Sequence, residues 1–523
     1  MVAKLQPDSA ASVATPLTHP RHKALVLGSG FGGLAAAVRL LAQGFDVEVL
    51  EALDQPGGRA RVFVEHDGHG AYRFDAGPTV ITAPFMFEEL FELLGEKLSD
   101  HVQMVPVTPF YNIRFDDGSW FRYTGDAAQM EAEVRRIAPD DVEGYRAFVT
   151  KSEAIFNVGF TRLAHKPFTH LSDMLRIVPD MMRLESYRTV YGLASRYVQH
   201  EKLRQVLSFH PLLVGGNPFD TTSIYTLILF LERHWGVHFP MGGTGALVDG
   251  LVSLIRRHGG KVQLNAAARR IDVADGKVTG VTLQDGSHRA CDLVISNVDS
   301  ATTYNKLIDA KHRKVWTDRR VANKRYSMGL FVWYFGTDRT YPDVAHHSIL
   351  LGPRYKELLQ DIFDHHTLAE DFSMYLHRPT ATDPSLAPPG CDGFYVLSPV
   401  PHLQAGVDWA ARAESYRQRL ADELERSGVL PHLKQHLTVS RVLTPQHFQD
   451  ELNSFRGAAF GMAPVLRQSA YFRPHNKSED IEGLYLVGAG THPGAGLPGV
   501  LSSARALDTF DLPGACRREA PAR

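Results

Sequence analysis

A glycine-rich segment near the start of the chain, residues 28–33 (GSGFGG), matches the G-x-G-x-x-G pattern of dinucleotide-binding loops. In that pattern Gly28 permits a tight turn, Gly30 keeps a side chain away from a pyrophosphate, and Gly33 lets a helix pack closely on a strand. The free N–H groups at the start of that helix would then face the phosphates. The segment therefore predicts that a dinucleotide binds here.

Glu51 lies at the end of the next apolar run, where an acidic side chain can bind the hydroxyls of a ribose. Its charge would repel the 2′-phosphate of NADP. Gly57, Gly58 and Arg59 follow, and we expect the backbone to approach the dinucleotide a second time there. Arg59 and Arg61 could offset phosphate charge. Taken alone, this short motif would equally fit a turn before a strand.

A second glycine-rich segment lies near the end of the chain, at residues 484–500. Its pattern predicts an apolar strand, a loop that contains Gly490, and a helix that begins near Pro498. The N–H groups at Gly499 and Val500 could stabilise negative charge on a bound cofactor. Because glycines and prolines also form ordinary turns, a purely structural loop is the alternative.

The elements that would hold these loops follow from the hydrophobic pattern. Two short apolar runs flank a segment rich in alanine and leucine, which predicts a parallel β-α-β unit. A later segment with helical spacing of its leucines ends at two glycines. The predicted strands are residues 23–27, 47–50, 262–264, 270–273, 278–283 and 293–296, and the predicted helices are residues 34–42 and 245–258. The fold class is therefore α/β, with a Rossmann-like domain.

Length and segment order indicate two domains. At 523 residues the chain is longer than one hydrophobic core usually supports. Two regions with other patterns interrupt the nucleotide-binding core, so that core is expected to be discontinuous, with an inserted α+β domain. The core is assigned residues 23–110, 235–310 and 456–510, and the insertion residues 111–234 and 311–455. Residues 1–22 and 511–523 are expected to be flexible tails.

Composition excludes several classes of protein. The formal net charge of −2 provides no field that would collect a nucleic acid. Cys291, Cys391 and Cys516 are far apart and lack CxxC spacing, which argues against a disulfide framework and fits a reducing cytoplasm. No segment is apolar and long enough to predict a signal peptide or a transmembrane helix.

Two pairs of adjacent histidines, His346-His347 and His365-His366, raise the question of a metal site. Adjacent side chains point to opposite faces of a strand, and no HExxH or carboxylate spacing accompanies either pair. We therefore expect no metal ion.

Four segments together resemble the bacterial phytoene desaturases, a carotenoid oxidoreductase family within the amine oxidase superfamily. They are residues 75–79, 213–218 and 239–247 and the C-terminal glycine-rich segment. The resemblance runs from residue 22 to residue 508. It implies FAD as the cofactor, a C40 polyene substrate, stepwise dehydrogenation of phytoene to neurosporene or lycopene, and peripheral membrane attachment. Met241, where arginine is expected, and residues 502–504 depart from the family pattern, which bears on the number of steps.

The resemblance also assigns roles to segments and residues. The discontinuous domain would bind FAD, and the insertion would bind the substrate and the inner face of the cell membrane from the cytoplasm. Quinone or oxygen would accept the electrons. The residues expected to bind FAD are Gly28, Gly30, Gly33, Glu51, Gly57, Gly58, Arg59, Ala268, Gly490, Pro498, Gly499 and Val500.

A face that docks on the membrane is expected because the substrate is a hydrocarbon. At ~0.8 kcal/mol per CH₂, about forty carbons would cost on the order of 30 kcal/mol to expose to water. Residues 161–205 carry eight Lys and Arg against four Asp and Glu. They also contain an apolar stripe at helical spacing, formed by Met174, Ile177, Val178, Met181 and Met182. This stripe is the predicted docking face, and an ordinary core-facing helix is the alternative.

Two polar residues near that stripe, Asp173 and Arg176, match polar positions of the family. They could assist proton removal or stabilise a cationic intermediate, and a surface ion pair is the alternative. The apolar run at residues 224–235 is expected to line a tunnel or to lie in the core.

Three other functions fit parts of the pattern. Sister desaturases that act on hydroxylated or C30 polyenes share these motifs. A soluble amine oxidase of the same superfold would release peroxide. A non-catalytic lipid escort would bind the polyene and leave the flavin oxidised.

Overall fold

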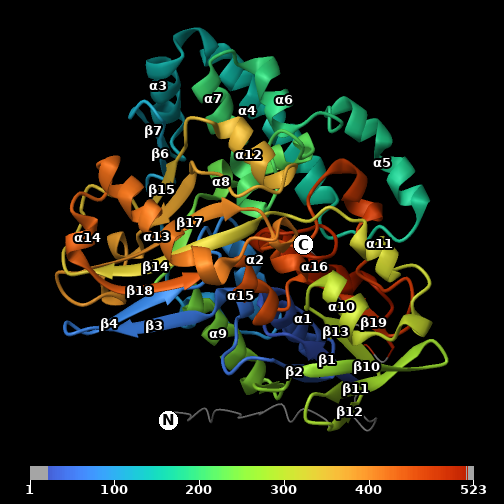
Figure 1. The fold of residues 1–523 in the computed structure, drawn as a ribbon. Coiled ribbons are helices and arrows are strands. Elements are labelled where there is room, and N and C mark those ends of the chain that lie inside the picture. The colour runs from blue at the N-terminus through green and yellow to red at the C-terminus, as the bar shows by residue number, and fades with distance from the viewer. Residues whose placement is uncertain (1–21, 514, 516–523) are drawn as a thin grey trace, which may run out of the picture.

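The computed structural model describes residues 22–513 and residue 515 of the chain, so most of both predicted tails and Cys516 lie outside the described residues. A five-stranded parallel sheet has the order β19-β13-β1-β2-β9. Its strands are β1 Lys23–Leu27, β2 Asp46–Leu50, β9 Lys261–Gln263, β13 Leu293–Ser296 and β19 Leu484–Leu486. They come from both ends and the middle of the chain, yet they lie together at the bottom of Figure 1.

Helices cover one face of this sheet, and smaller elements cover the other. Helices α1 Phe31–Ala42, α2 Pro84–Glu92, α9 Thr244–Arg257 and α16 Leu497–Arg505 share one hydrophobic core with alternate strand residues such as Val26 and Val49. The intervening residues, such as Leu25 and Leu50, pack against the opposite core. Burial on both faces explains why these strands are continuous apolar runs. The predicted β-α-β unit and the α/β fold class are confirmed.

A three-stranded antiparallel sheet adjoins the parallel sheet. It consists of β10 Ala268–Ala274, β11 Lys277–Leu283 and β12 His288–Ala290. Asp275 and Gly276 both have positive φ, of 49° and 77°, as the tight turn between β10 and β11 requires. The predicted strands at residues 270–273 and 278–283 fall within this sheet.

A seven-stranded sheet forms the second half of the molecule, in the order β18-β14-β17-β16-β15-β6-β7. Its strands are β6 Tyr111–Arg114, β7 Trp120–Tyr123, β14 Gly329–Thr337, β15 His347–Leu350, β16 Met374–His377, β17 Asp392–Val400 and β18 Leu437–Leu443. In β14, Val332 and Tyr334 face one core while Trp333 and Phe335 face the other, so both faces of the sheet are covered.

Helices at the top of Figure 1 cover one face of the seven-stranded sheet. They are α3 Ala127–Ile137, α4 Val142–Phe156, α6 Val190–Tyr197, α7 Glu201–Ser208 and α8 Leu227–Trp235. Helix α5 Leu171–Arg183 lies beside them and contributes no buried residue to this core. The other face is covered by α13 Trp409–Arg426 and α14 Leu433–His436. The remaining elements are β3 Val62–His66, β4 Ala71–Asp75, β5 Met104–Pro106, β8 His238–Pro240, α10 Ser300–Leu307, α11 Asp318–Ala322, α12 Tyr355–Phe363 and α15 Pro445–Asp450.

Helix α5 differs from its neighbours because no residue of it is buried. None of the helices in the described part of the chain is both long and apolar enough to span a bilayer.

Candidate functional site

One cavity of about 720 Å³ connects the two halves of the molecule. Its polar end is formed by the loops that follow β1, β2 and β19. Its other end is formed by apolar side chains of α5, α8 and the seven-stranded sheet. Of the residues expected to bind FAD, these line the cavity: Gly28, Gly30, Glu51, Gly57, Gly58, Arg59, Ala268, Gly490, Pro498, Gly499 and Val500.

Gly33 lies behind the cavity wall, where it holds α1 against β1. A Cβ on Gly33 would lie 2.0 Å from the carbonyl oxygen of Gly28. Only a glycine permits this approach, as the fingerprint predicts. Helix α1 has neither a side-chain cap nor an acidic residue in its first turn. Its first N–H groups therefore remain available to an anion in the cavity.

Asn297 is a cavity residue that the sequence motifs did not indicate. It follows β13, and its side chain fills the space beside the glycine loop. A Cβ on Gly30 would lie 2.9 Å from Asn297 Nδ2, and one on Gly32 would lie 2.4 Å from its Oδ1. The loop glycines therefore make room for Asn297 as well as for a ligand.

Glu51 is buried at the end of β2 and lines the cavity. Its Oε2 accepts hydrogen bonds from the backbone N of Ser29 at 2.8 Å and from Ser29 Oγ at 2.6 Å. Its Oε1 accepts from the backbone N of Leu53 at 3.0 Å. These bonds hold the carboxylate at the edge of the glycine loop, where its free lone pairs can accept from hydroxyl groups.

Arg59 and Arg61 have different surroundings. Arg59 lines the cavity and donates to Ser454 Oγ at 3.3 Å, while its Nε has no partner among the described residues. Burial lowers the pKa of the Arg59 guanidinium, and the nearby carboxylate of Asp299 opposes that shift. Arg61 does not line the cavity; it stacks on Phe63 and pairs with Glu451, which does line it. Of the two predicted phosphate partners, only Arg59 therefore lines the cavity.

The C-terminal loop brings a second helix N-terminus to the cavity. Helix α16 begins at Leu497, slightly earlier than predicted, with Pro498 in its first turn and no acidic residue there. The buried Arg473, another residue that no motif indicated, donates to the carbonyl oxygen of Ala489 at 3.1 Å. Its Nε and Nη1 have no partner within the described chain. This end of the cavity therefore has a helix dipole in its wall, and a buried cation that does not itself line the cavity supports the loop before α16.

Two segments that carry the family resemblance meet beside the cavity. Asp75, at the end of β4, accepts hydrogen bonds from the N-terminus of α9: from Thr244 N at 2.7 Å and from Gly245 N at 3.0 Å. Burial raises the pKa of Asp75 to about 6, and these two donors oppose the shift. Met241, the departure from the family pattern, does not line the cavity.

Residues that were predicted to line a tunnel or to form the docking stripe line the apolar end of the cavity. Its lining includes Ile224, Leu227, Ile228 and Leu231 from the run at residues 224–235, and Met174, Ile177 and Met181 from α5. A small polar network interrupts this wall. Thr79 Oγ1 lies 2.6 Å from the hydroxyl of Tyr395 and 3.2 Å from that of Tyr375. Burial raises the pKa of both tyrosines, so both hydroxyls keep their protons.

Asp173 and Arg176 lie outside the cavity. Asp173 accepts from the backbone N of His170 at 3.0 Å and pairs with Arg176 at 3.4 Å. Arg176 is 78% exposed. The ionisable side chains of α5 and α8 that do line the cavity are Asp180 and Glu232. The surface ion pair described as the alternative is therefore present.

The expectation that adjacent histidines point apart is wrong for His346 and His347. His346 precedes β15 and is not part of the alternating strand. The centroids of the His346 and His347 rings are therefore only 4.4 Å apart. His377 on β16 joins them. His365 instead is exposed and contacts Asp361, and His366 packs against His402.

A family model and the sequences of known proteins both match most of this chain. The family model described as flavin containing amine oxidoreductase matches residues 31–506. Phytoene desaturase (lycopene-forming) of Pseudescherichia vulneris is 50% identical over 92% of this chain and 98% of its own length. Phytoene desaturase (neurosporene-forming) of Rhodobacter capsulatus is 46% identical over 96% of this chain and 95% of its own length.

Solved structures share the fold. Cyclohexylamine oxidase from Brevibacterium oxydans superposes with a TM-score of 0.59 at 16% identity, over 94% of this chain and 98% of that one. An oxidoreductase from Methanosarcina mazei gives a TM-score of 0.60 at 18% identity, over 93% and 100% of the two chains.

Proposed function

Because this chain belongs to the flavin-containing amine oxidoreductase family, and within it to the bacterial phytoene desaturases, we propose that it is an FAD-dependent desaturase. Its substrate is phytoene, and successive dehydrogenations give neurosporene or lycopene. The observation that carries this proposal is the single cavity, in which dinucleotide-binding loops at one end continue into a long apolar wall at the other.

The polar end of the cavity fits FAD. Two helix N-termini, α1 and α16, open onto it without an acidic first turn. The Arg59 side chain also lines the cavity, and its Nε has no partner among the described residues. We propose that α1 and Arg59 bind the pyrophosphate and that Glu51 binds the ribose. We also propose that the N-terminus of α16 faces the flavin. Bound FAD supplies the hydride acceptor for the reaction.

The apolar wall positions the polyene. Phytoene offers no polar handle, so its orientation depends on the shape of a tunnel lined by residues such as Ile228 and Val332. The same side chains exclude water from the reacting carbons. Thr79, Tyr375 and Tyr395 are among the neutral polar residues that line the cavity.

A role of Asp173 and Arg176 in proton removal stays a prediction. Their contacts support a different contribution more directly, because Asp173 caps α5 and Arg176 pairs with it. Both adjoin Met174 and Ile177, which line the cavity. We propose that the pair keeps α5 in place over the end of the tunnel.

We propose that α5 is the segment through which the enzyme docks on the membrane. Its outward side exposes four apolar residues with 52%, 63%, 42% and 59% of their surface accessible: Leu171, Leu175, Val178 and Met182. Its inward side contributes Met174, Ile177 and Met181 to the cavity. The predicted stripe is thus divided between the tunnel and the outside.

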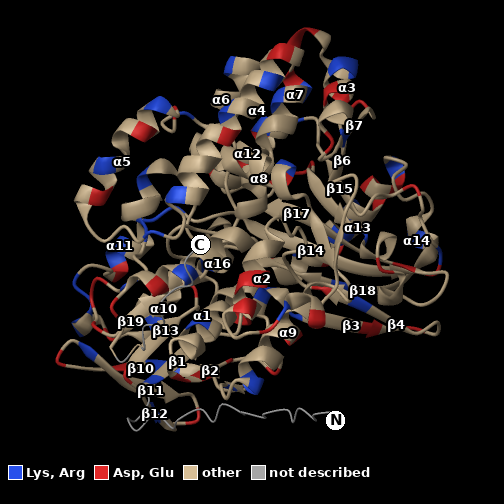
Figure 2. Cartoon of the chain, turned by 180° about the vertical axis from the view of Figure 1, so that it is seen from behind, with Lys and Arg blue, Asp and Glu red and all other residues tan. Residues whose placement is uncertain are grey.

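The surroundings of α5 support contact with lipid. In Figure 2 the helix lies at the edge of the molecule and carries charged residues of both signs beside its apolar side. A helix of this kind lies in the plane of the membrane interface with its apolar side buried. A polyene could then pass from the bilayer into the tunnel without entering water.

Reoxidation of the flavin is proposed to use a quinone or oxygen. A lipid-soluble quinone would share the bilayer with the polyene and could reach the same docked enzyme. We propose the cytoplasmic face of the cell membrane as the site of action.

Product analysis tests the proposal. Purified protein, FAD and phytoene-loaded liposomes are incubated together, and the pigments are separated by chromatography and identified by their spectra. We expect neurosporene or lycopene to form only when FAD is present. Unchanged phytoene with flavin bound would contradict the proposal and favour a hydroxylated or C30 polyene or an escort role.

A further inference from the structure

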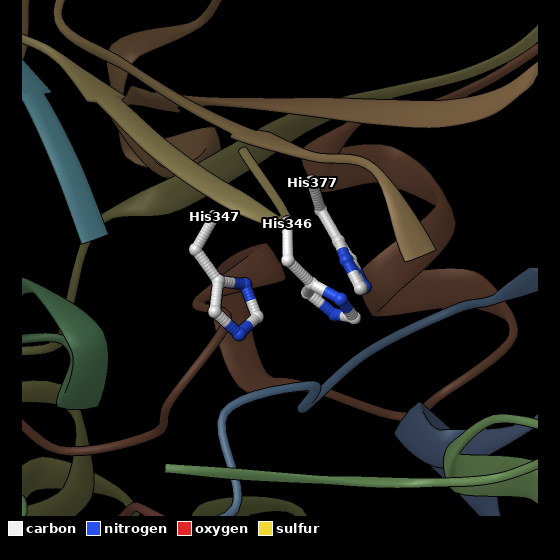
Figure 3. Close-up of side chains that lie close together, drawn as sticks. All are labelled: His346, His347 and His377. Atoms are coloured by element: carbon white, nitrogen blue, oxygen red, sulfur yellow. The ribbon is translucent and has the colours of Figure 1, made fainter. Parts of the chain in front are cut away.

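Three histidines form a compact buried cluster outside the cavity. His346 lies just before β15, His347 is the first residue of β15, and His377 is the last residue of β16, directly paired with His347. They are 5%, 0% and 1% exposed. One ring nitrogen of each lies within 4.8 Å of the others. Figure 3 shows the three rings side by side, pointing to the same side of the two strands.

Most of the ring nitrogens in this cluster have no partner within the described chain. His346 Nδ1 lies 2.6 Å from Thr382 Oγ1, and His347 Nδ1 lies 2.6 Å from the hydroxyl of Tyr375. The Nε2 atoms of His346 and His347 and both nitrogens of His377 are buried and unpartnered. Buried polar atoms are nearly always satisfied in folded proteins, so four such atoms in one place indicate a missing partner.

The hydrogen bonds present also set the tautomers that a ligand would need. If Nδ1 of His346 and Nδ1 of His347 each donate a proton to their hydroxyl partners, both Nε2 atoms present a lone pair to the cluster. Histidines that bind metal ions usually donate their second N–H to an oxygen in this way. The hydroxyls of Thr382 and Tyr375 therefore occupy the positions of such supporting oxygens.

The three rings are electrically neutral. Burial and, to a smaller extent, the charge of Arg378 lower the pKa of His346 to about 3. Burial also lowers the pKa of His347 and His377 well below the usual range of histidine. A neutral imidazole is the form that binds a metal ion, so no proton has to be displaced first.

We propose that His346, His347 and His377 bind one transition-metal ion of the kind that prefers imidazole ligands, such as Zn²⁺. Three protein ligands with a water or hydroxide in the fourth position are a common arrangement for this ion. Bonds of about 2.0–2.1 Å would place the nitrogens roughly 3.3 Å apart. Binding would therefore draw the rings together, which rotation of the soft terminal torsion of histidine allows.

The guanidinium of Arg378, whose charge acts on His346, is itself paired with the carboxylate of Asp392 at 2.9 Å. A bound hydroxide would compensate one unit of the charge of the ion. The ion would join β15 to β16 next to Tyr375, whose side chain lines the cavity. The inference does not depend on the proposed function.

Metal content tests this inference. The untagged, full-length, FAD-loaded protein is equilibrated with Zn²⁺, freed of loose metal by gel filtration, and analysed by mass spectrometry of its metals. We expect about one zinc per chain in the wild type, and a loss of at least tenfold in His347→Leu and in His377→Leu. The matched control replaces the other adjacent pair, His365→Ala with His366→Ala, and is expected to retain the zinc.

X-ray absorption of the zinc-loaded wild type identifies the zinc ligands directly and needs no variant. We expect three imidazole nitrogens at about 2.0 Å and no sulfur in the first coordination shell. Circular dichroism and the flavin spectrum identify any variant that fails to fold. Less than a tenth of an equivalent of zinc in the wild type would overturn the proposal. A spectrum that does not show three imidazole ligands would also overturn the proposal.

Discussion

Arg59 is a buried cation beside the glycine loop, and the proposed pyrophosphate site depends on it. Replacing Arg59 with alanine removes a charged donor, and hydrogen bonds to charged groups contribute about 1.5–3 kcal/mol. We expect Arg59→Ala to raise the dissociation constant of FAD by about 10- to 100-fold, measured by titration of the apoprotein with FAD. Arg61→Ala serves as the control, because Arg61 itself does not line the cavity, although its partner Glu451 does. Equal losses in both variants would contradict the assignment.

Asp75 makes the stability of the folded protein depend on pH in the acid range. Its pKa in the folded state is raised to about 6, above the ordinary value of 3.8, chiefly by burial. The folded state therefore holds this proton more tightly than the unfolded state does. The stabilisation is fully present below about pH 4 and is lost as the pH rises through 6.

The consequence can be measured as the free energy of unfolding between pH 4 and 7. We expect the wild type to lose roughly 2–3 kcal/mol from this group over that range. Asp75→Asn cannot titrate, and its stability should lack this decline. If the variant and the wild type show the same slope, other groups produce the pH dependence.

At the residue scale the motifs predicted part of the site. The glycines, Glu51 and Arg59 are close in sequence to one strand-loop-helix unit, so their spacing alone predicts that they lie together. Asn297 lines the same cavity from a distant segment, and Arg473 contacts the loop before α16 without lining the cavity. No local pattern marks either residue. Arg61 was expected at the phosphates by proximity in sequence. Its alternative partner, Glu451, is 390 residues away in the chain and could not be foreseen.

At the scale of elements, α5 has two apolar sides with different uses. The sequence showed the apolar spacing but could not tell which residues face the tunnel, since that depends on how the helix sits against distant segments such as Ala470–Phe472. The same limit applies to His346. Its place just outside β15 breaks the alternation on which the expectation of diverging side chains rested.

Two valines with equal exposure test the docking role of α5. Val178 on α5 and Val64 on β3 are both 42% exposed. Burying a valine in the membrane interface contributes up to about 1.5–3 kcal/mol, so a charge at Val178 should be costly there. We expect Val178→Glu to weaken binding to liposomes by about tenfold or more in a sedimentation assay, and Val64→Glu to bind as the wild type does. Equal binding of the two variants would contradict docking through α5.

At the scale of the whole molecule, the two large sheets draw their strands from alternating parts of the chain. The strands of the parallel sheet fall within residues 23–110, 235–310 and 456–510, and those of the seven-stranded sheet within residues 111–234 and 311–455. These are the segments assigned to the two domains, and the exact boundaries stay a prediction. The cavity lies where the two halves meet, so the cofactor loops and the apolar tunnel share one continuous cavity.

The central claim is that a flavin and a polyene meet in this cavity and exchange a hydride. Anaerobic mixing of the FAD-loaded protein with phytoene-loaded liposomes tests it most directly. Without an electron acceptor, the absorption band of oxidised flavin should disappear, and one new double bond should form in phytoene for each flavin reduced. A flavin that stays oxidised while the protein binds the polyene would contradict the claim, because a protein that only carries the polyene would behave in that way.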